Sequence, residues 1–324
     1  MPKAIVLHEY GRSDVLRLQA ITLKRPKAME IMVRQTAIGV HFHDIYVRTG
    51  LYKTLNLPGI PGLEAAGIVE AVGPGPSIFE TGDRVIYVTS EYGAYASHRI
   101  LPQKLAVKLP EGVSDAAAAA NFSRLLTVQM LMKNVAPPKP SQTILVTAAS
   151  GGVGRLLCQY AKAVGAHVIG TVGSAAKSDT AKSYGCDYTF TYDQSDFFNL
   201  VNDITAGKGV DIVYDSVGAK TFDSSLSILA SLGHLVNFGQ SSGPVEPLTI
   251  SRLAEKSLTL TRPILFHYLA DNDAYHMMAK SALEALENGM FILPDLRCVP
   301  LKDAAFAHDQ MQLGQGGGSL YLSP

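Results

Sequence analysis

The chain has 324 residues, and its 28 lysines and arginines balance its 28 aspartates and glutamates. This length fits two domains better than a single core. Because the formal net charge is zero, there is no bulk field to attract nucleic acid or an anionic membrane surface, so we expect a small-molecule partner.

No apolar run reaches about 18 residues, and charge appears in the first residues before any signal-like apolar stretch. We therefore expect a cytoplasmic protein that does not enter a membrane. The three cysteines, Cys158, Cys186 and Cys298, form no C-x-x-C pair. This spacing argues against a disulfide framework and against a four-cysteine zinc lobe.

Residues 1–122 are expected to be rich in β-strands. Short apolar runs alternate with turns that contain glycine and proline, a pattern typical of antiparallel sheets and barrels. The strand-like runs cover residues 4–7, 15–23, 30–40, 66–72 and 84–88, with a helical turn at 43–49. This part of the chain does not have the pattern of a nucleotide-binding fold.

A helix capped by Ser114 or Asp115 is predicted through the alanine run 116–120, with continuation over 125–135. From Thr143 onward, strands and helices alternate, which favours a parallel sheet. The predicted strands cover 143–148, 167–172, 210–215, 234–238 and 258–261, and the predicted helices cover 155–164, 221–230 and 271–288. The tail from residue 292 is expected to return to the N-terminal domain, which lacks a closing element.

The turn at 149–154 (ASGGVG) has the spacing of a dinucleotide-binding turn, with Ala149 where the first glycine usually stands. Gly151 would let the backbone approach a pyrophosphate, and Gly154 would let the next helix pack on the strand. The N-terminus of that helix would direct free N–H groups at the phosphates. A strand precedes the turn, and a helix and a second strand follow it, so the context that this motif requires is present.

A site that prefers NAD carries an acidic residue about 20 residues beyond the turn. Here Gly173 stands at that distance, and no carboxylate occurs between Gly170 and Ser178. Ser174 and Lys177 instead offer a hydroxyl and a cation suited to a 2′-phosphate, which predicts NADPH as the cofactor. The alternative is that Lys177 is one more solvated lysine at the start of a helix.

The chain resembles the medium-chain dehydrogenase/reductase superfamily, and within it the zinc-free quinone oxidoreductase family that includes zeta-crystallin. The resemblance covers nearly the whole chain. The segments that carry it are 37–39 (AIG), 44–52 (DIYVRTGLY), 61–67 (PGLEAAG), the turn at 148–154, 170–173 (GTVG), 214–218 (YDSVG) and 238–239 (FG). It implies an α/β chain with a Rossmann NADPH-binding domain at 123–267 and a GroES-like catalytic domain at 1–122 and 268–324.

By this resemblance, Lys177 and Tyr192 would hold the adenosine 2′-phosphate, and Gly152 and Gly173 would lie at the pyrophosphate and ribose. Ser216 and residues 238–241 would lie on the nicotinamide side, and residues 316–319 would lie close to the cofactor. The full implied set is His41, Ala149, Gly151, Gly152, Val153, Gly154, Gly173, Ser174, Lys177, Tyr192, Ser216, Phe238, Gly239, Gln240, Ser241 and Gly317.

The chain departs from the family pattern at two positions. His41 stands where members commonly have Asn, and Leu125 stands where they have a glycine. In zinc-dependent relatives a cysteine takes the place of His41 and a histidine the place of Leu63. Leucine cannot bind a metal, and one possible ligand does not make a site, so we expect no catalytic zinc.

The resemblance implies an NADPH-dependent reductase of quinones or related conjugated carbonyl compounds, acting by hydride transfer as a homodimer. Tyr46 and Tyr52 are the best candidates to hydrogen-bond the reduced oxygen or to pass a proton. The alternative for both is that they are aromatic lining residues with exposed hydroxyls. The alternative for the whole protein is a nucleotide-binding structural or RNA-contacting protein of the zeta-crystallin type with little turnover.

Overall fold

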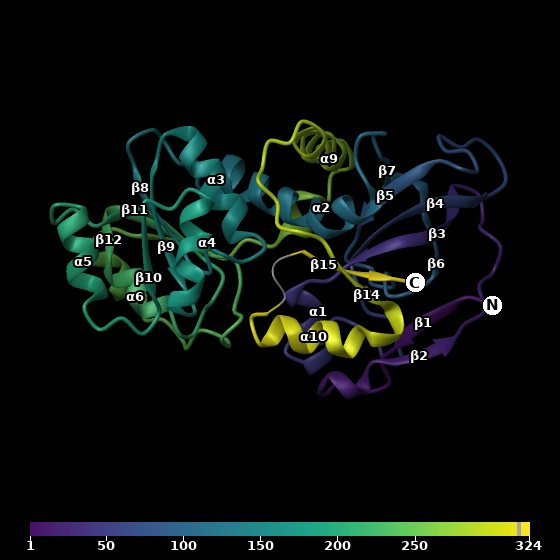
Figure 1. Ribbon diagram of the computed structural model, residues 1–324, viewed down its shortest axis with the longest axis horizontal. Helices are drawn as coiled ribbons and strands as arrows, with labels where there is room; N and C mark the ends of the chain where they lie inside the picture. The colour runs from purple at the N-terminus through teal and green to yellow at the C-terminus, as the bar shows by residue number, and fades with distance from the viewer. Residues whose placement is uncertain (316–318) are drawn as a thin grey trace. The chain divides into compact units, whose positions relative to one another are not determined.

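The computed structural model describes residues 1–315 and 319–324 (Figure 1). The chain forms two compact units, which we call the β-rich unit and the parallel-sheet unit. The β-rich unit comprises Met1–Ser123 and Leu269–Pro324, and the parallel-sheet unit comprises Arg124–Tyr268. Within the described residues, we find no helix with the length and apolar character to cross a membrane.

The β-rich unit contains a seven-stranded sheet in the order β14-β15-β3-β4-β5-β7, with β6 also paired to β3. All of its pairings are antiparallel except that of β14 with β15. A separate antiparallel ribbon is formed by β1 (Lys3–Val6) and β2 (Arg17–Ala20). The sheet strands are β3 (Glu30–Gly39), β4 (Glu64–Val72), β5 (Arg84–Val88), β6 (His98–Pro102), β7 (Ala106–Lys108), β14 (Arg297–Pro300) and β15 (Leu320–Ser323).

The C-terminal tail completes this sheet, as the sequence predicts. The last strand, β15, pairs with β3 so that Tyr321 lies opposite Gly39 and Leu322 lies opposite Ile38. Figure 1 shows this yellow C-terminal strand beside the purple β3 from the start of the chain. Leu320 and Leu322 are buried, so the pairing also brings apolar side chains into the core of the unit.

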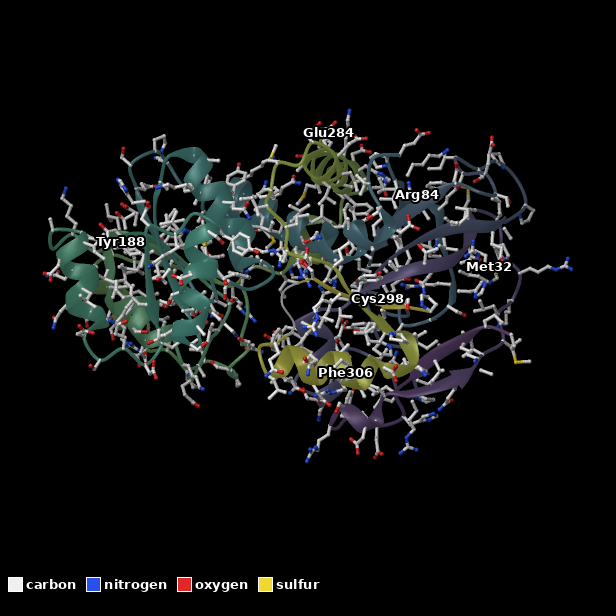
Figure 2. The ribbon with its side chains drawn as sticks, viewed as in Figure 1. Met32, Arg84, Tyr188, Glu284, Cys298 and Phe306 are labelled. Carbon is white, nitrogen blue, oxygen red and sulfur yellow. The ribbon has the colours of Figure 1, made fainter. Side chains whose placement is uncertain are left out.

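Helices and single turns fill the rest of the β-rich unit. They are α1 (Phe42–Thr49), α9 (Asn272–Glu287), α10 (Ala304–Gln312) and the 3₁₀ turns η1 (Ser13–Val15), η2 (Gln103–Leu105) and η5 (Leu301–Asp303). The division between the units falls within α2 (Asp115–Gln129). Its first residue, Asp115, accepts hydrogen bonds from Nε and Nη2 of Arg84 at 3.0 and 2.6 Å (Arg84 is labelled in Figure 2). This ion pair fixes the start of α2 to β5. The π-helical turn η3 (Met130–Val135) follows α2.

The parallel-sheet unit has six strands in the order β10-β9-β8-β11-β12-β13, and all pairings are parallel. The chain moves outward from β8 in one direction and then returns to β11 to build the other half. This is the strand order of a Rossmann fold, so the predicted fold class is confirmed. The strands are β8 (Thr143–Val146), β9 (His167–Val172), β10 (Tyr188–Thr191), β11 (Val210–Asp215), β12 (Leu229–Asn237) and β13 (Thr259–Thr261).

Helices connect these strands and pack on them. α3 (Gly154–Val164) contacts β8 and β9, α4 (Ser178–Ser183) contacts β9 and β10, and α6 (Phe222–Ser227) contacts β11 and β12. The remaining elements are α5 (Phe197–Ile204), α7 (Ser251–Ala254), α8 (Leu265–Tyr268) and the 3₁₀ turn η4 (Ala175–Lys177). Leu145, Ile169 and Val213 lie in one buried cluster. Their apolar side chains explain why these strands have continuous rather than alternating apolar sequences.

The prediction of a helix over residues 221–230 is wrong at its C-terminal end. The helix α6 stops at Ser227, and β12 already begins at Leu229. Leu229 is buried and pairs with Val210 of β11. The sheet gains that pairing and that apolar burial, which outweigh the weak local preference of these residues for a helix.

Candidate active site

The glycine turn joins β8 to α3 with very close backbone packing. A Cβ on Gly154 would lie 2.2 Å from the carbonyl oxygen of Ala148, so only glycine fits there. The N–H groups of Gly152 and Val153 make no hydrogen bond within the described residues. Two free N–H groups at the N-terminus of an 11-residue helix form an arrangement suited to a phosphate.

Two other residues of the predicted turn have local structural contacts. The N–H of Gly151 donates to the carbonyl of Ala148 at 2.8 Å, which closes the turn. Ala149 is fully buried, and its N–H donates to the carbonyl of Thr171 at 3.0 Å. Ala149 therefore joins the turn to β9, and its methyl group lies next to Gly170, where an added Cβ would come within 2.8 Å.

The segment after β9 carries the residues predicted to select the cofactor. Gly173 and Ser174 are exposed, and Lys177 is half-buried at the end of η4. Tyr192 follows β10, and its ring lies 3.6 Å from the position of a Cβ on Gly173. Burial raises the pKa of Tyr192 to about 12, although a hydrogen bond with the backbone of Ala148 acts in the opposite direction. Tyr192 therefore lies between the glycine turn and the end of β9.

The ends of β11 and β12 meet beside the same turn. The N–H of Ser216 donates to Oγ1 of Thr147 at 2.9 Å, and that hydroxyl donates to Asp215 at 2.9 Å. A Cβ on Gly239 would lie 2.6 Å from the carbonyl oxygen of Ser216. Phe238, Gln240 and Ser241 flank Gly239, and the N–H of Ser241 donates to the same Ser216 carbonyl at 3.2 Å.

The predicted nucleotide residues of the parallel-sheet unit therefore all follow the carboxyl ends of its strands. They follow β8, β9, β10, β11 and β12. In open parallel sheets, ligands bind outside these ends, where the strand order reverses. Gly317 lies outside the described residues.

The β-rich unit holds the two predicted catalytic tyrosines next to each other. Tyr46 lies on α1, and Tyr52 lies just beyond the helix. Their ring centroids are 5.1 Å apart in an edge-to-face arrangement. The N–H of Tyr52 donates to the carbonyl of Tyr46 at 3.0 Å, so the backbone also fixes the pair.

His43 extends this aromatic group. Its ring is 5.4 Å from that of Tyr52, and its Nε2 lies 3.0 Å from the hydroxyl of Tyr92. That hydroxyl also makes a short hydrogen bond with Thr54. Burial lowers the pKa of His43 to about 4, so its ring is neutral near pH 7. The ring of a neutral histidine therefore packs against the tyrosine pair.

His41 stands between β3 and α1, where it precedes the first residue of the helix. Its Nε2 is 2.6 Å from Oε2 of Glu64, the first residue of β4. The described residues include no group of three or more His, Cys, Asp or Glu side chains that could hold a metal ion. Leu63, beside Glu64, is 5% exposed and packs in the core.

Two family models match the chain. The alcohol dehydrogenase GroES-like domain matches residues 27–111, and the zinc-binding dehydrogenase model matches residues 152–284. Quinone oxidoreductase 1 of Escherichia coli is 39% identical over 328 aligned residues, which cover 100% of both chains. The chain belongs to the quinone oxidoreductase family.

Solved structures of the quinone oxidoreductase family have the same fold. The quinone oxidoreductase of Pseudomonas syringae pv. Tomato DC3000 superposes with a TM-score of 0.96 at 39% identity, with 100% of both chains covered. The E. coli enzyme complexed with NADPH gives a TM-score of 0.95 at 39% identity, with 99% of this chain and 100% of that chain covered. A 2-haloacrylate reductase of Burkholderia sp is 35% identical over 100% of this chain and 99% of its own.

Three polar residues that contact the predicted site residues of the β-rich unit are missing from the sequence prediction. His43 lies three residues before Tyr46 on one helix, so helical spacing could have identified it. Glu64 and Ser123 come from a strand and a helix far along the chain from His41, and their contact with it depends on the folded sheet. No local pattern indicates such a contact.

Proposed function

We propose that the protein is an NADPH-dependent reductase of quinones or related conjugated carbonyl compounds that works without zinc. The proposal rests mainly on the segment after β9, where Gly173 stands in place of the acidic residue of a site for NAD and Lys177 supplies a cation nearby. We also propose that residues 123–267 bind the cofactor and that residues 1–122 and 268–324 bind the acceptor.

The residues of the parallel-sheet unit fit a dinucleotide. The N–H groups of Gly152 and Val153 and the start of α3 would hold the pyrophosphate. Lys177 and Tyr192 would hold the 2′-phosphate, the first as a cation and the second through its hydroxyl. When bound, NADPH supplies a hydride to the acceptor.

The β-rich unit would supply the acceptor side. Tyr46 and Tyr52 would hydrogen-bond the oxygen of the acceptor that becomes negative as the carbonyl is reduced. Their edge-to-face contact and the ring of His43 hold the two phenols in place. The proposal of a zinc-free reaction is supported by the contact between His41 and Glu64 and by Leu63 at the neighbouring position.

Steady-state oxidation of NADPH, with and without 1,4-benzoquinone or an α,β-unsaturated ketone, tests this function. We expect an acceptor-dependent rate and a lower rate with NADH. Tight NADPH binding with no acceptor-dependent rate would refute the reductase and would favour a nucleotide-binding protein with little turnover.

We further propose that the protein is a cytoplasmic homodimer. The edge strands β10 and β13 each pair with a single neighbouring strand of the parallel sheet. The other edge of such a strand can pair with a second copy of the chain. Light scattering at micromolar concentration should give twice the monomer mass of 34.6 kDa. The monomer mass under those conditions would remove this proposal.

A further inference from the structure

Two cysteines that are far apart in the sequence lie side by side in the parallel-sheet unit. Cys158 belongs to α3, and Cys186, 28 positions later, lies between α4 and β10. Their Sγ atoms are 3.4 Å apart, and the thiol of Cys186 donates a hydrogen bond to the sulfur of Cys158. Cys158 is fully buried, whereas Cys186 is 7% exposed. The sequence spacing gives no sign of this contact, which the fold creates.

An ion pair joins the two segments that carry these cysteines. Cys158 and Lys162 are four residues apart on α3 and therefore lie on the same face of the helix. Nζ of Lys162 is 2.5 Å from Oδ1 of Asp187, the residue after Cys186. Oδ2 of Asp187 accepts a hydrogen bond from the N–H of Val168 in β9 at 2.8 Å. The segment around Cys186 is thus attached both to the helix of Cys158 and to the sheet.

The backbone before Cys186 lies close against α3. Gly185 has a φ of +100°, and a Cβ there would lie 3.2 Å from Cβ of Lys162 and 3.4 Å from the carbonyl oxygen of Cys158. Glycine is suited to both the positive φ and the close approach. A disulfide has its sulfur atoms about 2.05 Å apart, so the two thiols need to approach by about 1.4 Å more. Bond formation therefore requires only a small movement.

The same pair of cysteines lies beside the glycine turn. A Cβ on Gly170 in β9 would lie 2.6 Å from Sγ of Cys186 and 2.8 Å from Cβ of Ala149, so both side chains fill the space next to Gly170. Cys158 lies on the helix that begins at Gly154, where the backbone packing leaves no room for an added atom. A movement that brings the sulfur atoms together must therefore shift α3 or the packing of Ala149, and either shift changes the turn.

We propose that Cys158 and Cys186 are a modification site that a hydroperoxide closes into an intramolecular disulfide, and that the closed form binds the dinucleotide more weakly. The disulfide itself does not depend on the proposed function. Its effect on the nucleotide rests on the proposed NADPH site.

The reaction uses the two thiols in order. The sulfur of Cys186, the more exposed thiol, attacks one peroxide oxygen, and the O–O bond breaks. The second oxygen leaves with the thiol proton as water or an alcohol, and Cys186 becomes a sulfenic acid. The sulfur of Cys158 then attacks the sulfur of Cys186, the S–O bond breaks, and the hydroxyl leaves with the proton of Cys158 as water. The two thiols lose two electrons in total, and the peroxide gains them.

The surroundings of Cys158 fit the second of these steps. The hydrogen bond with Cys186 and burial raise the pKa of the Cys158 thiol well above its usual range. Cys158 therefore keeps its proton near pH 7, and a protonated thiol is a weak nucleophile. It is the resolving thiol, which reacts when a sulfenic acid forms beside it.

The variant Cys298→Ser provides a full-length protein in which these two cysteines remain, because Cys298 is the third cysteine of the chain and is exposed (labelled in Figure 2). After treatment with hydrogen peroxide, both thiols should resist alkylation in denaturant, and dithiothreitol should restore both. Mass spectrometry of proteolytic peptides should show Cys158 joined to Cys186. The matched control, Cys158→Ala in the same background, should form no cross-link and should instead gain oxygen at Cys186.

Fluorescence titration measures the effect on the nucleotide. The NADPH Kd of oxidised Cys298→Ser should rise about tenfold and should return to its starting value with dithiothreitol. Because coupling between two equilibria is reciprocal, saturating NADPH should lower the equilibrium constant for disulfide formation in dithiothreitol buffers by about the same factor. Cys186→Ala in the same background lacks the more exposed thiol, so peroxide treatment should leave its own Kd unchanged.

Three results would count against parts of this inference. Peroxide-treated Cys298→Ser that keeps two free thiols, or that carries oxygen on Cys158 or Cys186 with no cross-link, would overturn the modification site. A cross-linked protein with an unchanged NADPH Kd would overturn the effect on the nucleotide. Failure of the reduced protein to bind NADPH would instead refute the cofactor site of the proposed function, and the peptide map would still decide the disulfide.

Discussion

At the scale of single residues, Lys177 should set the choice of cofactor. It lies half-buried at the end of η4, five residues beyond the end of β9 at Val172. Lys177→Ala should remove one charge-assisted contact with the 2′-phosphate, on the order of 1.5–3 kcal/mol, or about 10–100-fold in NADPH affinity. Binding of NADH should barely change, because NADH lacks that phosphate.

Fluorescence titration with both nucleotides measures this preference. Lys182→Ala, on the exposed face of the neighbouring helix α4, is the matched control and should leave both affinities unchanged. Equal losses of NADPH and NADH affinity in Lys177→Ala would show that the residue supports the loop instead of reading the phosphate.

Tyr46 and Tyr52 should act on the acceptor. Tyr52→Phe and Tyr46→Phe should change quinone reduction mainly through KM, by about threefold, because each removes one hydrogen bond. Enone reduction should lose about tenfold in kcat, because the enolate is a stronger base than a hydroquinone anion. A collapse of quinone kcat with NADPH binding intact would show that a tyrosine supplies the proton even for the easier substrate.

The predictability of a site residue depends on how its contacts arise. Gly154 is predictable because a strand, a glycine turn and a helix form one continuous sequence pattern. Lys177 is predictable because the segment at that distance beyond the turn lacks a carboxylate and contains a cation. The contact of His41 with Glu64 joins the N-cap of α1 to the first residue of β4, and the burial that makes His43 neutral arises from the folded unit. Such features become visible only in three dimensions.

At the scale of elements, the glycine turn should tolerate no larger residue at Gly154. In Gly154→Ala, the added Cβ would lie 2.2 Å from the carbonyl oxygen of Ala148 and 2.9 Å from its carbon, so β8 and α3 must move apart. Overpacking of this kind costs about 1–3 kcal/mol of unfolding free energy. The movement should also shift the N–H groups of the turn and weaken NADPH binding by about tenfold.

Urea unfolding and NADPH titration measure the two effects. Gly173→Ala is the stability control, because its added Cβ would only make an ordinary contact with Tyr192 at 3.6 Å. It should retain the wild-type unfolding free energy. Wild-type stability in Gly154→Ala would show that the turn can relax and that the close approach is not required.

Strongly patterned elements are predictable from the sequence, and short edge elements are not. The strands at 84–88, 167–172 and 210–215 coincide with β5, β9 and β11 because each is rich in β-branched residues and lies between clear turns. β10 and α5 are absent from the prediction. β10 has four residues, of which Tyr188 is 47% exposed (Tyr188 is labelled in Figure 2), so it lacks the apolar run of a central strand.

At the scale of the whole molecule, a buried polar chain couples stability to pH. The hydroxyl of Tyr95 lies 3.2 Å from Oδ2 of Asp44 and 2.9 Å from Nε2 of His308, and all three side chains are fully buried. Burial lowers the pKa of His308 to about 3 and that of His43 to about 4, and it raises the pKa of Asp44 to about 6. The folded state therefore prefers the neutral forms of His308, His43 and Asp44.

The two kinds of group act on stability with opposite signs. Above pH 6.5 the histidines are neutral in both the folded and the unfolded state. As pH falls below 6.5, they bind protons in the unfolded state but not in the folded state, so the free energy of unfolding decreases. Asp44 adds stability below pH 4 that is lost as pH rises through 6, because the folded state keeps its proton longer. Two histidines oppose one carboxyl, so the net effect of these groups is a loss of stability from pH 6.5 towards pH 4.

His308→Gln should reduce this acid sensitivity. The variant removes the histidine whose pKa is lowered most by folding. Between pH 7 and pH 4, the free energy of unfolding should therefore decrease by about 2–4 kcal/mol less in the variant than in the wild type. At pH 7 it should be less stable than the wild type by about 1–2 kcal/mol, because the contact with Tyr95 is altered.

Urea unfolding at several pH values measures both quantities. His8→Gln, at an exposed position of the same unit, is the control and should follow the wild-type curve. A pH dependence in His308→Gln that is parallel to the wild type would show that other groups cause the acid loss of stability.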